Sequence, residues 1–278
     1  MSETGSNLLS AEVELPFGDK EPHELASLDV DRLRINLLKS KSPQTVKNIL
    51  ALLRRIIHFG VKKAICQAPG FSIQMPTKIN NIKTEDLSDE EMGRFLAVLA
   101  NDPDIQVTNL MRLALCTGMR RSELFRLKWD HIDFERGFIH IIDPKGGPDQ
   151  KIPLNESART VVEDHPRMEG TPFIFPGKNG NQRVEIRKAA NRIKRDAGLP
   201  EDFRPLHGLR HTYASMLASS GKVDLYTLQK LLTHKSPEMT QRYAHLRDET
   251  LKKASDLAST IVEQAAAGAS KKVIHLTE

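Results

Sequence analysis

Apolar side chains recur at helical spacing through most of the chain, most clearly within residues 43–60. There they fall every three or four positions, at Val46, Ile49, Leu50, Leu53, Ile56 and Ile57. A serine caps the free amides of a helix and a proline suits its first turn, so Ser42-Pro43 predicts the start of this helix. We expect the helix to end near Gly60.

Further helices are predicted on either side of a linker. A shorter helix is expected around residues 28–38, and residues 68–81 have the proline, glycine and asparagine content of a linker. Ser88 and Glu91 fit a capping box, in which each side chain accepts a hydrogen bond from the other residue's amide. Residues 107–116 are a second apolar helix of this later region.

The period changes after Ile132. Residues 138–142 favour a strand, because all but one are β-branched or aromatic, and residues 151–154 form a second after the turn-rich residues 144–148. The pattern is helical again from Asn155 onward. The expected fold class is therefore mainly α with a small antiparallel β-sheet, an α+β arrangement.

The two ends of the chain differ in pattern. Residues 1–24 have no periodicity and predict a disordered acidic arm. Residues 249–264 predict an amphipathic helix. After this helix we expect an Ala/Gly hinge beginning at Ala265, followed by a short β-like strand over residues 271–276.

The chain of 278 residues has a formal charge of +5, too small by itself to indicate nucleic-acid binding. Its distribution is more informative. Residues 1–30 hold seven acids and one base, residues 31–63 nine bases and one acid, and residues 178–195 seven bases and one acid. Basic faces are thus concentrated in separate elements, which fits either ordinary solvated helix faces or contact with DNA phosphates.

Cysteine usage and hydropathy favour a cytoplasmic protein without a membrane partner. Cys66 and Cys116 lack the spacing of a metal site, so we expect free thiols in a reducing compartment. No apolar run is long enough to span a bilayer, and residues 1–4 lack the basic start of an export signal.

Tyr243 is the candidate nucleophile, because it follows several cationic groups. A tyrosine hydroxyl, with a pKa of about 10, is a poor nucleophile unless positive charge or a base favours the phenolate. His207 and Arg210 lie three residues apart, so on a helix both could reach one phosphate. Arg120 lies where a turn enters a helix, whose amides favour anions. Glu123 either holds the Arg120 guanidinium or forms an ordinary surface ion pair.

Together these residues resemble the tyrosine recombinases, or phage integrases, in order, spacing and context. The motifs are Thr117-Gly118-Met119-Arg120-Arg121-Ser122-Glu123-Leu124, Lys145 in a β-turn, His207-Gly208-Leu209-Arg210-His211, Leu231-Leu232-Thr233-His234 and Tyr243-Ala244-His245. The resemblance covers about residues 85–260, and residues 42–60 are similar to the later part of the family's helical core-binding domain. It implies a recombinase catalytic domain preceded by a short core-binding domain.

The resemblance implies covalent catalysis on DNA. Tyr243 attacks the scissile phosphate and forms a 3′-phosphotyrosyl link, which releases a 5′-hydroxyl. Arg120 and Arg210 bind the non-bridging oxygens, since a guanidinium donates two parallel hydrogen bonds and keeps its charge. Lys145 protonates the departing oxygen. Because the phosphotyrosyl ester keeps the free energy of the bond, neither ATP nor a metal is needed and no cofactor is expected.

Supporting roles follow from the same resemblance. His207 and His234 assist by proton transfer and by hydrogen bonds to the phosphate, and Glu123 orients Arg120 or His207. The family usually has glycine where this chain has Thr233, immediately before His234.

Several residues compete for these roles. Tyr213 and Tyr226 lie among apolar residues at helical spacing, so core packing is the expected role of both. Lys151 is the alternative to Lys145, and the family's pattern favours the turn lysine. His211 is expected to be a satisfied core histidine.

Four regions are expected: the arm (1–24), a short helical core-binding DNA domain (25–82), the catalytic domain (83–264) and a C-terminal tail (265–278). The family's core-binding domain usually has about four helices, whereas there is room here for about two. We expect that the gene is truncated, that the clamp is incomplete, or that the acidic first 30 residues replace something. DNA contacts are expected at Lys47, Arg54, Arg55, Lys62, Lys63, Arg187 and Arg192.

The expected function is site-specific recombination of double-stranded DNA, as for a mobile element, by a tetramer assembled on the DNA. Accessory DNA-bending or directionality proteins are further expected partners. In the family a segment after the tyrosine packs on a neighbouring protomer, and residues 250–276 are the candidate. Two alternatives stay open: a DNA-binding regulator without turnover, which the intact motif residues disfavour, and a type IB topoisomerase-like enzyme, which Arg210-His211-Thr212 disfavours.

Overall fold

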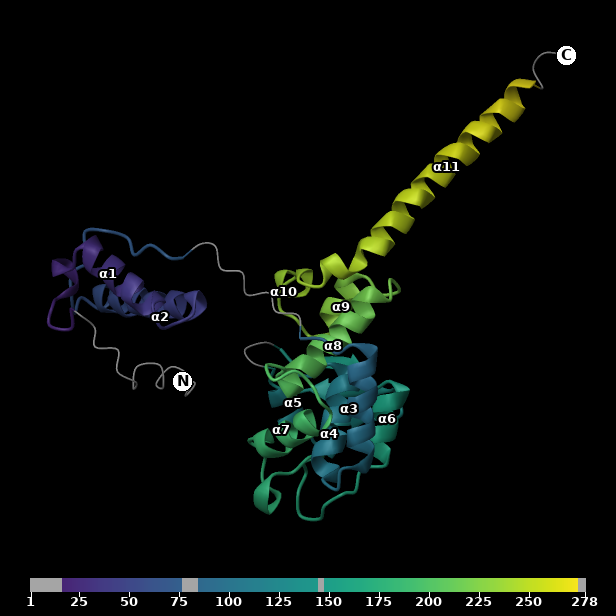
Figure 1. Ribbon diagram of the computed structural model, residues 1–278, viewed down its shortest axis with the longest axis horizontal. Helices are drawn as coiled ribbons and strands as arrows, with labels where there is room; N and C mark the ends of the chain where they lie inside the picture. Colours follow the sequence, from purple (N-terminus) through teal and green to yellow (C-terminus); the bar gives the residue numbers. More distant parts are fainter. Residues whose placement is uncertain (1–16, 77–84, 145–147, 275–278) are drawn as a thin grey trace. The chain divides into compact units, whose positions relative to one another are not determined.

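The computed structural model describes residues 17–76, 85–144 and 148–274, and the chain divides into two compact units between Ile82 and Lys83. The first unit contains a short 3-10 helix and two α-helices (Figure 1), which are η1 (Pro22–Glu24), α1 (Ser27–Leu38) and α2 (Pro43–Lys62).

The two helices of the first unit form where the sequence predicts them. The side chain of Ser42 accepts a hydrogen bond from the amide of Thr45, which caps the first turn of α2. Val46 and Leu50 on α2 are fully buried against the apolar face of α1. The side chains of this small core are Phe17, Leu25, Val30, Leu33, Leu37, Val46, Leu50, Ile57 and Ile73.

Two expectations for this unit are wrong in part. Phe17 is 7% exposed and lies in the core, so residues 17–24 are not a disordered arm, while residues 1–16 lie outside the described part of the chain. Ile73 also lies in the core, so the first part of the expected linker packs on the helices. An apolar side chain gains about 1.5–3 kcal/mol on burial, which is enough to order a short extended segment.

The second unit is a helical domain with a small sheet (Figure 1). Its helices are α3 (Asp89–Asn101), α4 (Ile105–Thr117), α5 (Arg121–Arg126), η2 (Trp129–His131), α6 (Glu156–Glu163), η3 (Lys178–Gly180), α7 (Arg187–Asp196), α8 (Pro205–Ser219), α9 (Leu225–Leu231), α10 (Glu238–Gln241), η4 (Ala244–Arg247) and α11 (Asp248–Ile274). The strands are β1 (Ile132–Asp133), β2 (Phe138–Ile141) and β3 (Gln150–Pro153).

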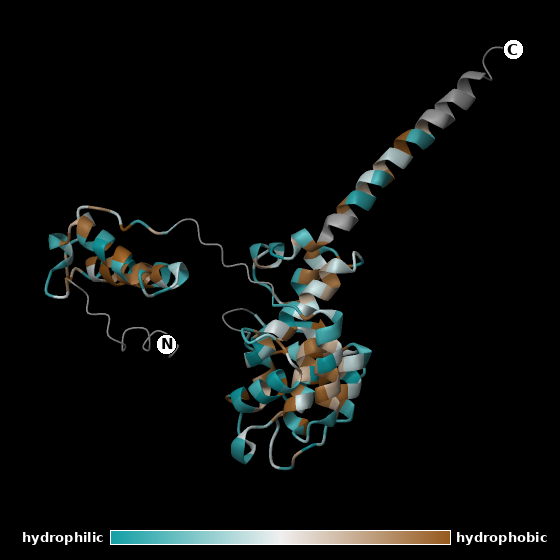
Figure 2. Cartoon of the chain, in the orientation of Figure 1, coloured by the Kyte–Doolittle hydropathy of each residue, from teal (hydrophilic) through white to brown (hydrophobic). Residues whose placement is uncertain are grey.

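Helix α4 is the centre of this unit. It packs against α3, α6 and α8, and nine of its thirteen residues are buried. In Figure 2 the apolar residues gather in the interior of the unit and the hydrophilic residues on its outside. The capping box predicted at the start of α3 is confirmed, with Ser88 and Glu91 each accepting from the other's amide.

The predicted antiparallel sheet is confirmed and has a third, short strand. β2 lies between β1 and β3, with Ile139 opposite Ile132 and Ile152. Apolar residues alternate along β2, which places Ile139 and Ile141 in the core. Lys145 belongs to residues 145–147, which lie outside the described part of the chain.

The expected end of the chain is wrong. Instead of a hinge at Ala265 and a strand from Lys271, α11 continues as one helix to Ile274. Alanine is the best helix former, so a run of alanines extends a helix more readily than it interrupts one. Every described side chain from Leu251 to Ala265 is exposed. Among the described residues, no helix combines the length and the apolar content that crossing a membrane requires.

Candidate active site

The site is built around Gly118, where α4 ends. Gly118 has a φ of 64°, a left-handed conformation that caps the helix and reverses the chain toward Arg120. A side chain is excluded there, since a Cβ atom on Gly118 would lie 2.4 Å from Cδ1 of Tyr213. The carbonyl oxygen of Gly118 accepts a hydrogen bond from Nη1 of Arg210 at 2.5 Å, which ties this turn to α8.

Arg120 is held from two directions. Its Nη1 atom lies 2.8 Å from Oε1 of Glu123, and Oε2 of the same carboxylate accepts from the Arg120 amide at 2.8 Å. From the other side, Nη1 donates to Oγ1 of Thr233 at 2.5 Å and Nη2 donates to the Thr233 carbonyl at 3.0 Å. The Glu123 side chain is 2% exposed and that of Arg120 28%, so the guanidinium is fixed in orientation and still reaches the surface.

Arg210 is the buried partner of Arg120. Its two terminal nitrogens donate to the carbonyls of Gly118 and Leu232, and the residue is 7% exposed. Burial, and then the positive charge of Arg120, lower the pKa of Arg210 to about 10. It therefore stays cationic at neutral pH. The turn at Leu232 and Thr233 supplies acceptors to both arginines and so sets their spacing.

His234 follows this turn and is half-buried. Its Nδ1 atom lies 2.8 Å from Oγ1 of Thr240, a buried residue of α10. Burial, followed by the charges of Arg210 and Arg120, lowers the pKa of His234 to about 3. The imidazole is therefore neutral at physiological pH and offers one N–H donor.

Tyr243 lies just beyond α10 and is 3% exposed. Its hydroxyl is 2.6 Å from Nδ1 of His211 on α8. Burial raises the pKa of Tyr243, and the nearby cations of Arg242 and Arg210 only partly oppose that effect. The expectation that surrounding charge favours the phenolate is thus wrong for the protein without DNA, where the hydroxyl keeps its proton.

The site therefore joins two arginines, a carboxylate, neutral imidazoles and a tyrosine from the start of α5, from α8 and from the turns after α9 and α10. Residues 85–250, which contain all of them, match the phage integrase family. The chain belongs to the phage integrase family. Its fold agrees with this, since the mainly helical unit with a three-stranded sheet is that of tyrosine recombinase catalytic domains.

Tyrosine recombinases are found among the similar proteins. The chain is 30% identical over 188 residues to tyrosine recombinase XerA of Pyrococcus furiosus. The matched region covers 66% of this chain and 65% of XerA. It is 26% identical over 242 residues to the shufflon-specific DNA recombinase of Escherichia coli, covering 84% of this chain and 61% of that protein. The chain thus spans less than two thirds of the length of either relative.

A solved structure shows the same fold. The Tn1549 transposon integrase, residues 82–397 in complex with circular intermediate DNA, superposes with a TM-score of 0.70 at 20% identity, over 86% of this chain and 87% of that one.

The two other tyrosines, Tyr213 and Tyr226, differ in their burial. Tyr213 packs against the α4 cap at Gly118, as expected of a core residue. The prediction of core packing for Tyr226 is wrong, because its side chain is 67% exposed and lies under the ammonium group of Lys230. Apolar neighbours at helical spacing place a residue on a helix face but do not say whether another element covers it.

The two candidate lysines are not equally described. Lys151 lies on β3 with its ammonium group 4.7 Å from the centre of the Phe138 ring. Lys145 and its turn lie outside the described residues. Within the part of the chain that is described, no group of three or more histidine, cysteine, aspartate or glutamate side chains could hold a metal ion.

The residues predicted to contact DNA lie on two helices. On α2, Lys47, Arg54, Arg55 and Lys62 fall on one half of the helix, beside the buried face of Val46 and Leu50, and Lys63 caps it. On α7, Arg187 is exposed, whereas Nη2 of Arg192 contacts both carboxylate oxygens of Asp102 at 2.7 and 2.6 Å. Arg192 is thus already bound to a buried carboxylate, which gives it a structural role.

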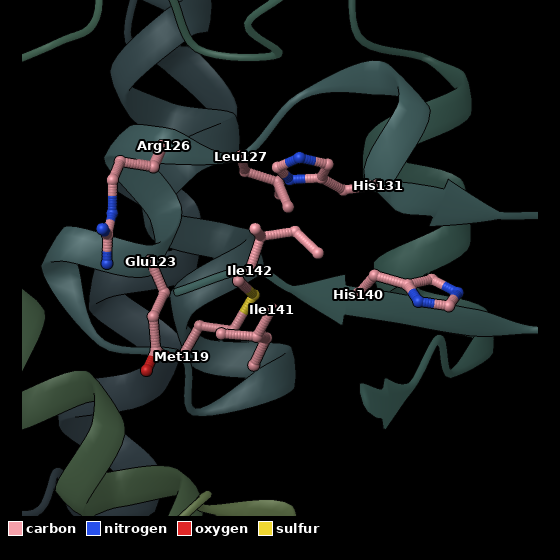
Figure 3. A pocket seen from close by; sticks show the side chains of 8 residues that line it. All are labelled: Met119, Glu123, Arg126, Leu127, His131, His140, Ile141 and Ile142. Carbon is pink, nitrogen blue, oxygen red and sulfur yellow. The ribbon is translucent and has the colours of Figure 1, made fainter. Parts of the chain in front are cut away.

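A small pocket lies beside the buried carboxylate of Glu123 (Figure 3). Glu123 and Arg126 of α5 line one side, and His131 and His140 lie on the other. The remaining walls are apolar, formed by Met119, Leu127, Ile141 and Ile142. The pocket therefore packs against Glu123, and its one arginine, Arg126, is held by Asp143 and not by the arginine pair.

Sequence reasoning missed two features of the site. His211 is buried as expected, but its partners are Tyr243 and His207 rather than core atoms. Its position four residues after His207, on the same helix face, was the available signal. The second feature is the hydrogen bond from Arg120 to Thr233. The sequence marks Thr233 only as a departure from the family's glycine, because the contact joins residues 113 positions apart.

Proposed function

We propose that this protein is a site-specific DNA recombinase that cleaves and rejoins strands through a 3′-phosphotyrosyl intermediate on Tyr243. The observation that supports it best is the anchoring of Arg120 and Arg210 by two adjacent residues, Thr233 and Leu232. The same turn leads through His234 to Tyr243. One short segment therefore connects the cationic pair to the nucleophile.

The charge of the site suits a phosphodiester in its transition state. Arg120 and Arg210 contribute two positive charges, and Glu123 contributes one negative charge in direct contact with Arg120. Fixed donors stabilise the growing negative charge of a pentacoordinate phosphorus without reorganising during the reaction. The protein carbonyls that hold the guanidinium groups supply that fixed geometry.

The histidines and the turn lysine complete the proposed chemistry. His234 donates to a phosphate oxygen from its neutral ring, and His207, an exposed residue in the first turn of α8, accepts or supplies a proton. Lys145 protonates the departing 5′-oxygen, a role taken from the family resemblance. Because the phosphotyrosyl ester keeps the bond energy, a second 5′-hydroxyl reverses the step.

The first unit is the proposed DNA clamp. The basic stripe of Lys47, Arg54, Arg55 and Lys62 lies along one half of α2, beside its apolar face. These cations make no ion pair with another described residue, so they are available to phosphates. Double-stranded DNA would contact this stripe through its phosphates and the arginine pair through the scissile phosphate, with a tetramer assembled on the recombining sites of a mobile element.

Helix α11 is the proposed contact between protomers. Leu251, Leu257, Ile261 and Val262 are each at least 58% exposed along a helix that the rest of its own chain leaves uncovered in the described residues. Burying such a stripe on a neighbouring protomer removes apolar area from water. Truncation after Arg247 should abolish strand exchange between duplexes and leave covalent cleavage in place. Unchanged synapsis would contradict this assignment.

A nicked suicide DNA substrate tests the whole proposal. The full chain is incubated with it, and covalent protein–DNA adducts are resolved on denaturing gels. The wild-type protein and the control Tyr226→Phe should form the adduct, and Tyr243→Phe should not. An adduct that persists in Tyr243→Phe, or no adduct with any substrate, contradicts the proposal; the latter favours a regulator without turnover. Relaxation of supercoils without strand exchange favours a topoisomerase-like enzyme.

A further inference from the structure

Three side chains form one line of hydrogen bonds that ends at the proposed nucleophile. Oη of Tyr243 lies 2.6 Å from Nδ1 of His211, and Nε2 of His211 lies 3.0 Å from Nε2 of His207. The two imidazoles are one helical turn apart on α8, with ring centroids 4.5 Å apart and planes at 86°. His211 is 4% exposed, whereas His207 lies at the surface.

The hydrogen-bonding capacity of the three groups fixes where the protons lie. Burial raises the pKa of Tyr243, so its hydroxyl is protonated and donates to Nδ1 of His211. A neutral imidazole has one N–H, which must then be at Nε2 of His211 and points to Nε2 of His207. The proton of a neutral His207 is consequently at Nδ1. Each bond in the line runs in the same direction, from Tyr243 toward His207.

We propose that His211 is a catalytic residue of the cleavage step: it takes the Tyr243 proton at Nδ1 and passes its own Nε2 proton to Nε2 of His207. This inference rests on the proposed function of Tyr243 as nucleophile. The bond from Oη to phosphorus forms while the bond from phosphorus to the 5′-oxygen breaks. His211 ends neutral with its proton on Nδ1, His207 ends as an imidazolium, and the 5′-oxygen takes a proton from the separate acid assigned to Lys145.

The surroundings explain why the proton passes through His211 without stopping there. Burial lowers the pKa of His211 to about 3, and nearby His207 and the cations of Arg242, Arg204 and Arg210 act in the same direction. An imidazolium at this position is therefore unstable. His207 has an exposed edge, and although burial and Arg204 lower its pKa, the carboxylate of Glu85 acts in the opposite direction. Glu85 is bound by Arg204, with both its oxygens within 2.9 Å of Nε.

The proton positions can be measured without DNA. In full-length protein carrying ¹⁵N-labelled histidine, we expect Nδ1 of His211 to have the chemical shift of an unprotonated nitrogen that accepts a hydrogen bond. Nε2 should have that of a protonated nitrogen. Tyr243→Phe should move the Nδ1 signal and leave that of buried His165 unchanged. A protonated Nδ1, or no response to Tyr243→Phe, would overturn the proposed relay.

Kinetics separate a proton relay from a packing role. His211→Gln keeps a hydrogen-bond acceptor for Tyr243 but cannot pass a proton, so adduct formation on the suicide substrate should slow by about 100-fold at neutral pH. The rate should recover as pH rises, with a slope of about one, because solvent hydroxide replaces the relay. A substrate with a 5′-bridging sulfur needs no acid at the leaving group, and should not rescue His211→Gln.

The matched control is His165→Gln, at a buried histidine whose Nδ1 contacts Asn109. It should cleave at the wild-type rate with the wild-type pH profile. A His211→Gln rate equal to or faster than that of the wild type, or full rescue by the sulfur substrate, overturns the relay alone. Absence of any adduct from the wild-type protein overturns the relay together with the proposed function.

Discussion

Nη1 of Arg120 lies 2.5 Å from Oγ1 of Thr233, a residue whose φ is 51°. A β-branched residue in the left-handed region is strained by about 1–2 kcal/mol, which is why glycine is common in such turns. Here the hydroxyl offsets the strain by accepting a hydrogen bond from a guanidinium, a contact worth about 1.5–3 kcal/mol. The departure from the family's glycine thus adds an anchor for Arg120.

Two substitutions separate these opposing effects at Thr233. Thr233→Gly removes both the strain and the hydroxyl, so the free energy of unfolding should change by only about 1 kcal/mol. Thr233→Val keeps the strain and loses the acceptor, so it should destabilise by about 2 kcal/mol relative to the wild type. Both should slow cleavage, because Arg120 becomes less fixed. Urea denaturation measures the free energy of unfolding. A valine variant as stable as the glycine variant would contradict this account.

Gly118→Ala should be strongly destabilising. It places a Cβ atom 2.4 Å from Cδ1 of Tyr213 at a φ of 64°, so we expect a loss of about 2–4 kcal/mol and a displaced carbonyl for Arg210. The matched control is Gly93→Ala inside α3, where a Cβ meets nothing within 4 Å. That change should stabilise by about 0.5–1 kcal/mol. Thermal unfolding of both variants checks the contrast.

The two candidate lysines can be distinguished by leaving-group chemistry. Lys145→Ala should slow cleavage of an ordinary phosphodiester by about 100-fold or more, since the 5′-oxygen then departs without a proton. A 5′-bridging sulfur substrate should restore the rate. Lys151→Ala removes a cation that lies over Phe138 and should leave both rates nearly unchanged. If the sulfur substrate rescues Lys151→Ala and does not rescue Lys145→Ala, the general acid is Lys151 on β3.

The two α7 arginines should respond differently to truncation. Arg192→Ala leaves the Asp102 carboxylate, whose side chain is 6% exposed, without its partner and should destabilise the fold by about 1–2 kcal/mol. Arg187→Ala should leave stability unchanged and weaken DNA binding, with a salt dependence reduced by about one phosphate contact. Unfolding curves and binding titrations at two salt concentrations test the pair. If both variants weaken DNA binding equally and neither lowers the stability of the fold, the structural role of Arg192 is contradicted.

Acid should destabilise the protein below about pH 6.5. The pKa of His211 and that of His234 are each lowered to about 3 in the folded state, from the ordinary histidine value of about 6.5. Between these values the unfolded chain binds protons that the folded chain does not. Stability is therefore full above pH 6.5 and falls as the pH decreases toward 3, with a slope of up to about 1.4 kcal/mol per pH unit for each group. His211→Gln should reduce the slope measured by urea denaturation across this window; an unchanged slope would contradict the burial of a neutral His211.

Most helices, the sheet and the motif residues could be predicted from the sequence, because periodicity, caps and spacing are local properties. Ser42 and Ser88 cap the helices they predicted, and Ile139 and Ile152 face each other in the predicted sheet. The order and spacing of the motif residues also carried the resemblance to the tyrosine recombinases.

Which site residues contact one another depends on the tertiary structure. The Arg120–Thr233, Arg210–Gly118 and Tyr243–His211 contacts join residues 113, 92 and 32 positions apart. Both anchors of Arg210, at Gly118 and Leu232, are main-chain carbonyls, which every residue possesses and no sequence pattern marks. Burial likewise depends on what packs over a side chain, so Tyr226 proved exposed and Tyr243 buried with its proton retained.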